Sequence, residues 1–91
     1  MCDNNLIHYK SFKEIVIGCG FFESPDPIMF RYQEELAYCY VFYEYDRIEI
    51  GVFSNPPNMK TLYKVIIRDI NELATELNKS IELINNYKET L

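Results

Sequence analysis

The sequence has little of what many active sites are built from. Among its 91 residues are one histidine, three cysteines, three glycines and no tryptophan. Cys2, Cys19 and Cys39 are odd in number and contain no Cys-x-x-Cys pair, which excludes a zinc site of the usual paired spacing and favours reduced thiols. We therefore expect no metal and no cofactor.

Long hydrophobic runs and an excess of positive charge are also missing. No segment approaches the ~18 apolar residues of a membrane span, and no basic start precedes an apolar stretch as in a signal peptide. These absences predict a cytoplasmic protein without a membrane partner. The nine basic and fourteen acidic residues give a net charge of −5, which argues against direct binding to nucleic acid and favours a partner protein with a basic surface.

Large side chains are plentiful instead. Hydrophobic residues make up 48% of the chain and aromatic residues 15%, with eight tyrosines and six phenylalanines. This composition and length predict one compact domain over residues 1–91. A domain of this size has a thin core, so we also expect it to gain from a second copy and to form a homodimer.

The first quarter of the chain is expected to be extended where it is ordered. Residues 1–10 are weakly patterned, so they either fray or contribute a short strand at Leu6 to Tyr9. Lys13 to Glu23 carries β-branched and aromatic residues on both sides of Gly18-Cys19-Gly20, which predicts two short strands or one strand bent at the glycines. Ser24 to Pro27 and Ser54 to Asn58 each hold two prolines and are expected to form stiff loops.

Strands dominate the middle of the chain and a helix ends it. Runs of aromatic and β-branched residues predict strands at Ile28 to Gln33, Leu36 to Tyr45, Arg47 to Phe53 and Thr61 to Arg68. Asp69, with Glu72 three residues later, resembles a capping box and predicts a helix over about 69–89. The apolar stripe of this helix comprises Ile70, Leu73, Ala74, Leu77, Ile81, Ile84 and Tyr87. The expected fold class is α+β, an antiparallel meander sheet of four to five strands packed against one C-terminal α-helix.

No group of residues forms a convincing catalytic set. Gly18-Cys19-Gly20 lacks a third glycine and a following helix, so it does not predict a phosphate loop, and no basic neighbour is evident to activate Cys19. His8 is the only imidazole, and it has no assigned carboxylate or nucleophile. The carboxylate pairs lie in a loop, Glu34-Glu35, and at a hairpin end, where solvated side chains are usual. We therefore expect a protein that is not an enzyme.

The hairpin around Tyr45-Asp46 is the most informative feature. With this dipeptide at its tip, the numbers of opposite residues sum to 91. The core face then pairs Cys39 with Val52, Val41 with Ile50 and Tyr43 with Ile48. The other face places Glu44 against Arg47, Phe42 against Glu49, Tyr40 over Gly51 and Tyr38 beside Phe53.

This second face is the predicted binding surface. Its centre consists of Tyr38, Tyr40, Phe42 and Phe53, and its rim of Glu44, Asp46, Arg47 and Glu49. Two alternatives remain open. The N-terminal strands or residues 21–30 cover the face as a second core layer, or a register shifted by one residue inverts the two faces.

The predicted function is a small non-enzymatic protein-binding module, an inhibitor or adaptor that acts through this aromatic face. Acidic chains rich in Tyr, Asn and Ile with a small sheet and one helix are common in phages and mobile elements, a likeness of composition that names no family. The alternative function is a small-ligand-binding domain with a pocket between sheet and helix, lined by Tyr43, Tyr63 and Cys39.

Overall fold

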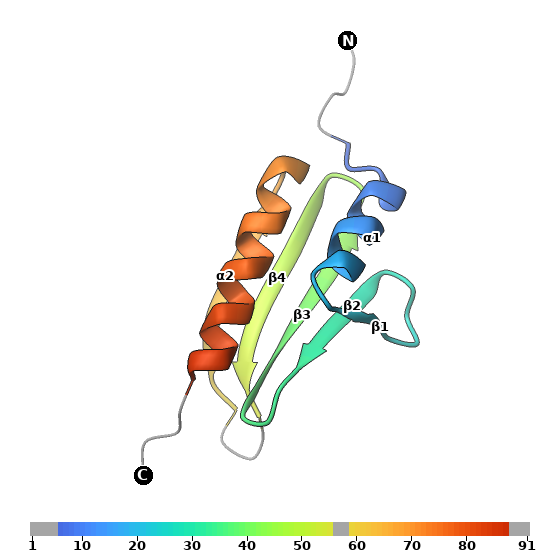
Figure 1. Cartoon of the computed structure of the whole chain (residues 1–91). Coiled ribbons are helices and arrows are strands. Elements are labelled where there is room, and N and C mark those ends of the chain that lie inside the picture. Colours follow the sequence, from blue (N-terminus) through green and yellow to red (C-terminus); the bar gives the residue numbers. More distant parts are fainter. Residues whose placement is uncertain (1–5, 56–58, 88–91) are drawn as a thin grey trace.

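Five strands and two helices make up the chain in a computed structural model that describes residues 6–55 and 59–87 (Figure 1). In chain order the elements are α1 (Tyr9–Gly18), β1 (Phe22–Glu23), β2 (Met29–Gln33), β3 (Ala37–Glu44), β4 (Arg47–Ser54), β5 (Thr61–Ile67), a 3-10 turn (Ile70–Glu72) and α2 (Leu73–Asn86). Within these residues no helix is both long and apolar enough to cross a membrane.

The strands form a single antiparallel sheet in the order β1-β2-β3-β4-β5, so each strand pairs with its neighbour in sequence. This confirms the α+β meander with a C-terminal helix against it. The register of β3 and β4 is also confirmed, because the pairs run from Ala37 opposite Ser54 to Glu44 opposite Arg47. The alternation of side chains therefore divides the hairpin into the two faces that the sequence predicts.

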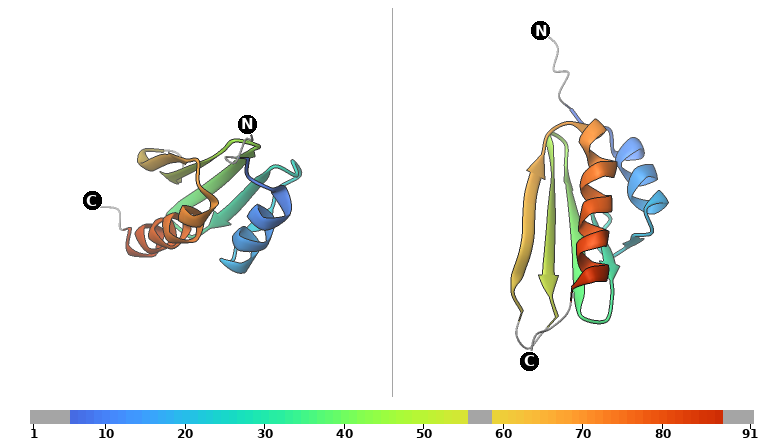
Figure 2. Two further views of the ribbon diagram at one scale, coloured as in Figure 1. Left: turned by 90° about the horizontal axis from the view of Figure 1, so that it is seen from above. Right: turned by 60° about the vertical axis from the view of Figure 1, so that its left-hand side comes forward.

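Both helices lie on the same face of the sheet (Figure 2). The aromatic ring of Phe12 in α1 packs 5.4 Å from Phe30 and 4.9 Å from Tyr43, measured between ring centroids. Val16, one helical turn further along α1, is fully buried as well. The core thus lies between this face of the sheet and the two helices.

Helix α1 is a correction to the sequence analysis, which expected strands over residues 13–23 and a strand or frayed chain before them. Phe12 and Val16 are four residues apart, so one face of a helix buries both. The glycines end this helix and do not form a bulge, and Gly20 adopts a φ of 98°, which a residue without a side chain adopts most readily. Residues 1–5 lie outside the described residues.

Helix α2 follows the predicted stripe with two differences. Leu73, Leu77 and Ile84 are buried, but Ala74 is exposed and Ser80 takes a buried place in the core. The Ser80 hydroxyl donates a hydrogen bond to the Glu76 carbonyl at 2.9 Å, which allows this polar side chain to be buried.

Asp69 caps the start of the C-terminal helical segment, as predicted, but it accepts a different backbone N–H from that of Glu72, which a capping box would use. The Asp69 carboxylate accepts the Asn71 backbone N–H at 3.0 Å, so the cap engages the second residue of the 3-10 turn. Helix α2 ends at Asn86, short of the predicted boundary near 89, and residues 88–91 lie outside the described residues.

The sequence predicts stiff loops at two proline-rich segments, Ser24 to Pro27 and Ser54 to Asn58. The first joins β1 to β2, and there the Asp26 carboxylate accepts the Ile28 backbone N–H at 3.2 Å, as in an Asx turn. The prolines of the second loop, Pro56 and Pro57, lie outside the described residues.

Candidate functional site

The face of the sheet opposite the helices carries the predicted aromatic centre. Both alternatives to this arrangement are wrong. The register is not shifted, since Tyr40 lies opposite Gly51 and Tyr38 opposite Phe53. The segment 21–30 does not cover the face either, because β1 pairs at the edge of the sheet and Phe30 is buried opposite Val41 in the core. Both helices pack on the other side (Figure 2).

Three of the four predicted aromatic side chains form a stack, which we call the ring stack: Tyr38, Phe53 and Tyr40. Phe53 lies in the middle, with centroids 5.7 Å from both tyrosine rings and interplanar angles of 24° and 12°. The Arg31 guanidinium lies 4.2 Å from the centroid of Tyr38 and extends the stack onto β2. The rings are half-buried although neither α1 nor α2 covers them, because they shield one another.

Gly51 makes room for the ring stack. A Cβ atom at this position would lie 2.7 Å from Tyr40 Cε2 and 2.8 Å from Phe53 Cε1, closer than van der Waals contact permits. The prediction that an aromatic ring covers a strand glycine is therefore confirmed, and two rings share the space. Any larger residue would push Tyr40 and Phe53 away from each other or from the strand.

A charged network fixes the tyrosine at one end of the stack. The Tyr40 hydroxyl donates a hydrogen bond of 2.7 Å to Glu49 Oε2, and Lys64 Nζ lies 3.3 Å from the same oxygen. Burial and this bond raise the pKa of Tyr40 to about 12, while the bonds from Tyr40 and Lys64 lower the pKa of Glu49. Glu49 thus lies within the face, between β3 and β5, and not at the rim where the sequence analysis placed it.

The hairpin tip holds the remaining charged residues of the predicted rim. Arg47 Nε donates to Glu44 Oε1 at 2.6 Å, and its Nη1 lies 4.0 Å from Asp46 Oδ2. The Glu44 bond is the main cause that raises the pKa of Arg47. Phe42 lies between this tip and the ring stack, opposite Met29 on β2 and Glu49 on β4.

Several residues of the face were missed by the sequence analysis. The alternation of β2 and β5 places Arg31, Gln33, Lys64 and Ile66 on the same side as the ring stack. The Tyr38 hydroxyl also reaches Met59 Sδ at 3.4 Å. The signal was present in the period-two patterns of the outer strands, but the registers that connect them to the hairpin depend on loops that are longer than the two-residue connection at Tyr45-Asp46.

Two of the three thiols and the histidine lie apart from this face, and Cys2 lies outside the described residues. Burial raises the pKa of Cys19 at the end of α1, and it raises the pKa of the fully buried Cys39 to about 12, so both favour the thiol form. His8 is exposed at the N-cap of α1. Among residues 6–55 and 59–87, no cluster of His, Cys, Asp or Glu is arranged to hold a metal ion.

The three side chains that were predicted to line a ligand pocket make contacts within the protein itself. Cys39 has no exposed surface, the Tyr43 hydroxyl donates to the Ile7 carbonyl, and the Tyr63 hydroxyl donates to Glu76 Oε1 at 2.6 Å. The polar groups that were expected to meet a ligand are therefore bonded to the protein itself.

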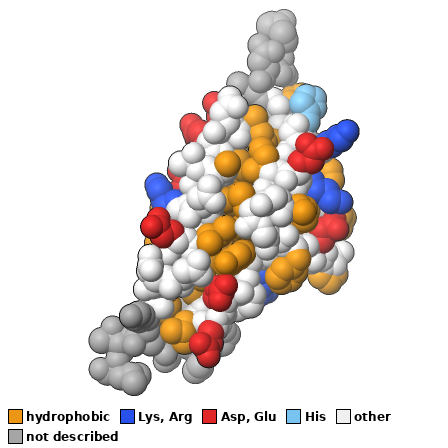
Figure 3. Space-filling view, in the orientation of Figure 1, with side chains coloured by type: hydrophobic (Ala, Val, Ile, Leu, Met, Phe, Trp, Pro, Cys, Tyr) orange, Lys and Arg blue, Asp and Glu red, His pale blue; other side chains and the backbone are white. Residues whose placement is uncertain are grey.

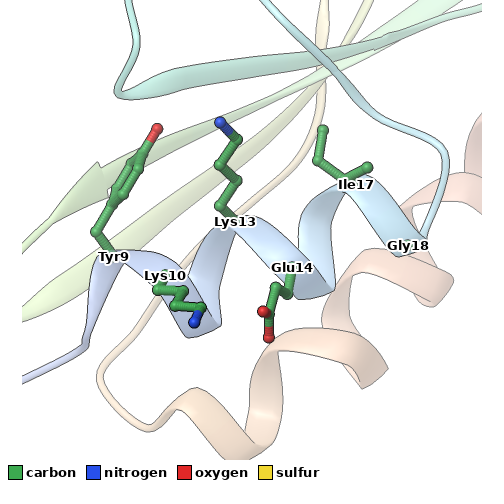
Figure 4. Close-up of a pocket in the computed structure, with 6 residues that line it drawn as sticks. All are labelled: Tyr9, Lys10, Lys13, Glu14, Ile17 and Gly18. Carbon is green, nitrogen blue, oxygen red and sulfur yellow. The ribbon is translucent and has the colours of Figure 1, made fainter.

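Two hollows of the described residues lie away from these three side chains. One of about 570 Å³ lies along α1 and is lined by Tyr9, Lys10, Lys13, Glu14, Ile17 and Gly18 (Figure 4). A smaller one, of about 160 Å³, lies beside the β2–β3 turn and the end of α2. On the helix-bearing side, hydrophobic side chains also form a band between α1 and α2 (Figure 3). Since one helix supplies every lining residue of the larger hollow, it lacks the converging walls of a ligand pocket.

No protein-family profile matches the chain, and neither a curated protein nor a solved structure matches it significantly.

Proposed function

We propose that the chain is a small protein-binding module that acts through the aromatic face of its sheet. The observation that carries this proposal is the placement of both helices on the other side, so that no helix or strand of the described residues covers the ring stack. A 91-residue protein gains most by burying its largest side chains. Aromatic residues held on an open face are therefore better explained by recognition than by folding.

The ring stack has the properties of an interface centre. Tyrosine and arginine are the residue types in which the binding energy of interfaces is concentrated, and here Tyr38 and Arg31 lie against each other. The contacts of Phe53 with both tyrosines fix the rings before a partner arrives. A preordered surface loses little side-chain entropy on binding, so more of the contact energy contributes to affinity.

The charges of the face favour a partner with an apolar contact patch. Glu49 is neutralised by Lys64, and Glu44 by Arg47, while the Arg31 guanidinium lies against the Tyr38 ring, so most charges around the rings are paired. The net charge of −5 belongs to the molecule as a whole and favours encounter with a basic protein over long distances. Affinity would then come from the rings, and the rate of encounter from the net charge.

A module of this size with one contact face is suited to act as an inhibitor or adaptor, which blocks or joins other proteins by occupying a surface. The small-ligand alternative has no comparable support, because the hydroxyls of Tyr43 and Tyr63 are bonded within the protein.

The test compares two truncations on opposite sides of the molecule. Tyr38→Ala removes the ring between Arg31 and Phe53, and Ile17→Ala removes an exposed apolar side chain from α1. A protein captured from the source cell by the immobilised wild-type chain is purified, and its affinity is measured for the three chains. We expect Tyr38→Ala to weaken binding at least ~10-fold, mainly through faster dissociation, and Ile17→Ala to leave it unchanged.

Tyr38 is preferable to Tyr40 for this test, because Tyr40 also bonds Glu49 and fills the space over Gly51. Circular dichroism and thermal unfolding establish that each variant is folded. Equal affinities for Tyr38→Ala and the wild type, with a loss at Ile17→Ala, would move the binding site to the helix side and overturn the proposal.

A further inference from the structure

The two edges of the sheet are built very differently. The β1 edge has only two residues and is followed by Pro25 and Pro27, which interrupt pairing with another strand. The β5 edge is seven residues long, and within the described residues its only neighbour is β4. Long free edges present unpaired backbone groups to other chains, and proteins usually shorten or cover them. We infer that β5 is an assembly edge, and that two copies of this chain pair antiparallel along it into one continuous sheet.

Two backbone hydrogen bonds show which residues of β4 direct their N–H and C=O groups toward β5. The Ser54 N–H donates to the Lys60 carbonyl at 3.0 Å, so Ser54 faces β5. Near the other end, the Tyr43 N–H on β3 donates to the Ile28 carbonyl, just before β2, so the backbone groups of Tyr43 point away from β4. Its partner on β4, Ile48, therefore directs its own N–H and C=O groups toward β5. Because backbone direction alternates along a strand, the N–H and C=O groups of Ile50 also point toward β5, where its partner is Val65. The N–H and C=O groups of the residues next to Val65 therefore point away from the sheet.

Those outward residues are Lys64 and Ile66, and they favour one register of the pair. If Val65 lies on the two-fold axis, each Lys64 is opposite Ile66 of the second copy, and the two residues exchange both backbone hydrogen bonds. A register that is centred on Lys64 opposes two ammonium groups, and one centred on Ile66 opposes Lys64 and Arg68. The Val65-centred register avoids both repulsions and covers Ile66, which is 49% exposed in the single chain.

A lysine on an edge strand ordinarily discourages pairing with another chain, and β5 carries Lys64. Its ammonium group lies 3.3 Å from the Glu49 carboxylate on β4, so its charge is drawn toward the sheet and away from the free edge. The irregularity of β5 is also placed outside the paired region, because the register shift occurs opposite Val52 and Phe53, before Tyr63 to Ile67. The central part of β5 is thus regular and available. The two-fold axis would place both aromatic faces on the same side of the joined sheet.

The first test is sedimentation velocity over a series of protein concentrations. The wild-type chain should shift from the mass of one chain to that of two as concentration rises. Ile66→Lys brings two lysines opposite each other in each half of the pair and should keep the chain monomeric over the same series. Phe22→Lys makes the same change at a 53% exposed residue of the opposite edge, and it should associate like the wild type. A wild-type chain that stays monomeric, or equal association of the two variants, would overturn the inference.

The second test reads the register and does not depend on the first variant being stable. In a background with Cys2 and Cys19 changed to Ser, Val65→Cys places two thiols at a non-hydrogen-bonded pair, where Cα atoms ~4.5 Å apart permit a disulfide. Oxidation should yield a covalent dimer. Tyr63→Cys is the control, because the register places this position opposite Ile67 of the second copy, so the two introduced thiols lie far apart. Cross-linking of the control as fast as Val65→Cys would contradict the register, and no cross-linking of Val65→Cys would contradict the pairing.

Discussion

The two faces of the β3–β4 hairpin use the same backbone and differ in almost everything else. Toward the helices, Cys39, Val41, Ile50 and Val52 are fully buried, and all are small or aliphatic. Toward the open side, the same strands carry the ring stack, which is half-buried by its own members and by Arg31. The comparison indicates that the covered face holds the fold together and that the open face is maintained by local contacts. In the proposed function, stability and recognition therefore depend on alternate residues of the same two strands.

The largest expected effect is on the covered face. Leu77 is fully buried in α2, so Leu77→Ala should lower the free energy of unfolding by ~2–5 kcal/mol in a denaturant titration. Thr75→Ala on the exposed side of α2 should change it by less than ~0.5 kcal/mol. Tyr38→Ala on the open face should cost less than Leu77→Ala. A loss at Tyr38→Ala as large as that at Leu77→Ala would show that the open face stabilises the fold as much as the covered face does.

A smaller effect is expected from filling the space beneath the rings. Gly51→Ala places a methyl group against Tyr40 and Phe53 and should lower the free energy of unfolding by ~1–3 kcal/mol. Gly18→Ala is the matched control, because no atom lies within 4 Å of its Cβ and the residue belongs to α1. It should leave stability unchanged or raise it by up to ~1 kcal/mol. Equal and small effects at both positions would show that the rings move aside without cost.

The smallest effect concerns the charge within the open face. Because folding lowers the pKa of Glu49 below its ordinary value of 4.5, the carboxylate contributes stability that is present above that pH and is lost as the pH falls through the folded pKa. Glu49→Gln should therefore cost about 1 kcal/mol or less at pH 7, and the difference from the wild type should shrink in acid. Unfolding titrations at pH 7 and pH 3 measure this, and a difference that grows in acid would contradict it.

The hairpin register could be predicted because its determinants are local. A two-residue connection at Tyr45-Asp46 fixes which residues are opposite, and alternation then assigns every side chain of β3 and β4 to a face. The Glu44–Arg47 ion pair and the Tyr40 ring over Gly51 followed from this register alone. What could not be predicted is Glu49's place inside the face, since its second contact, Lys64, comes from a strand beyond a longer loop.

Helix α1 was missed for a different physical reason. Ile15, Val16 and Ile17 are β-branched and favour strands locally, and glycines at 18 and 20 are typical of an interrupted strand. The helix is stabilised by tertiary contacts, because Phe12 packs on Phe30 and Tyr43 from two different strands. Ten residues are too few for a helix to be stable in isolation, so the sheet decides this conformation and the local sequence does not.

The consecutive strand order has a consequence for how quickly the protein reaches its native state. Since β1 to β5 each pair with the next strand along the chain, most sheet contacts join residues that are close in sequence. Folding rates of small domains rise as the mean sequence separation of their contacts falls, because short loops lose less entropy on closing. This sheet can therefore be assembled hairpin by hairpin, and strands up to β4 can pair before α2 has been synthesised. Because β5 is the last strand along the chain, its outer edge is completed after the rest of the sheet.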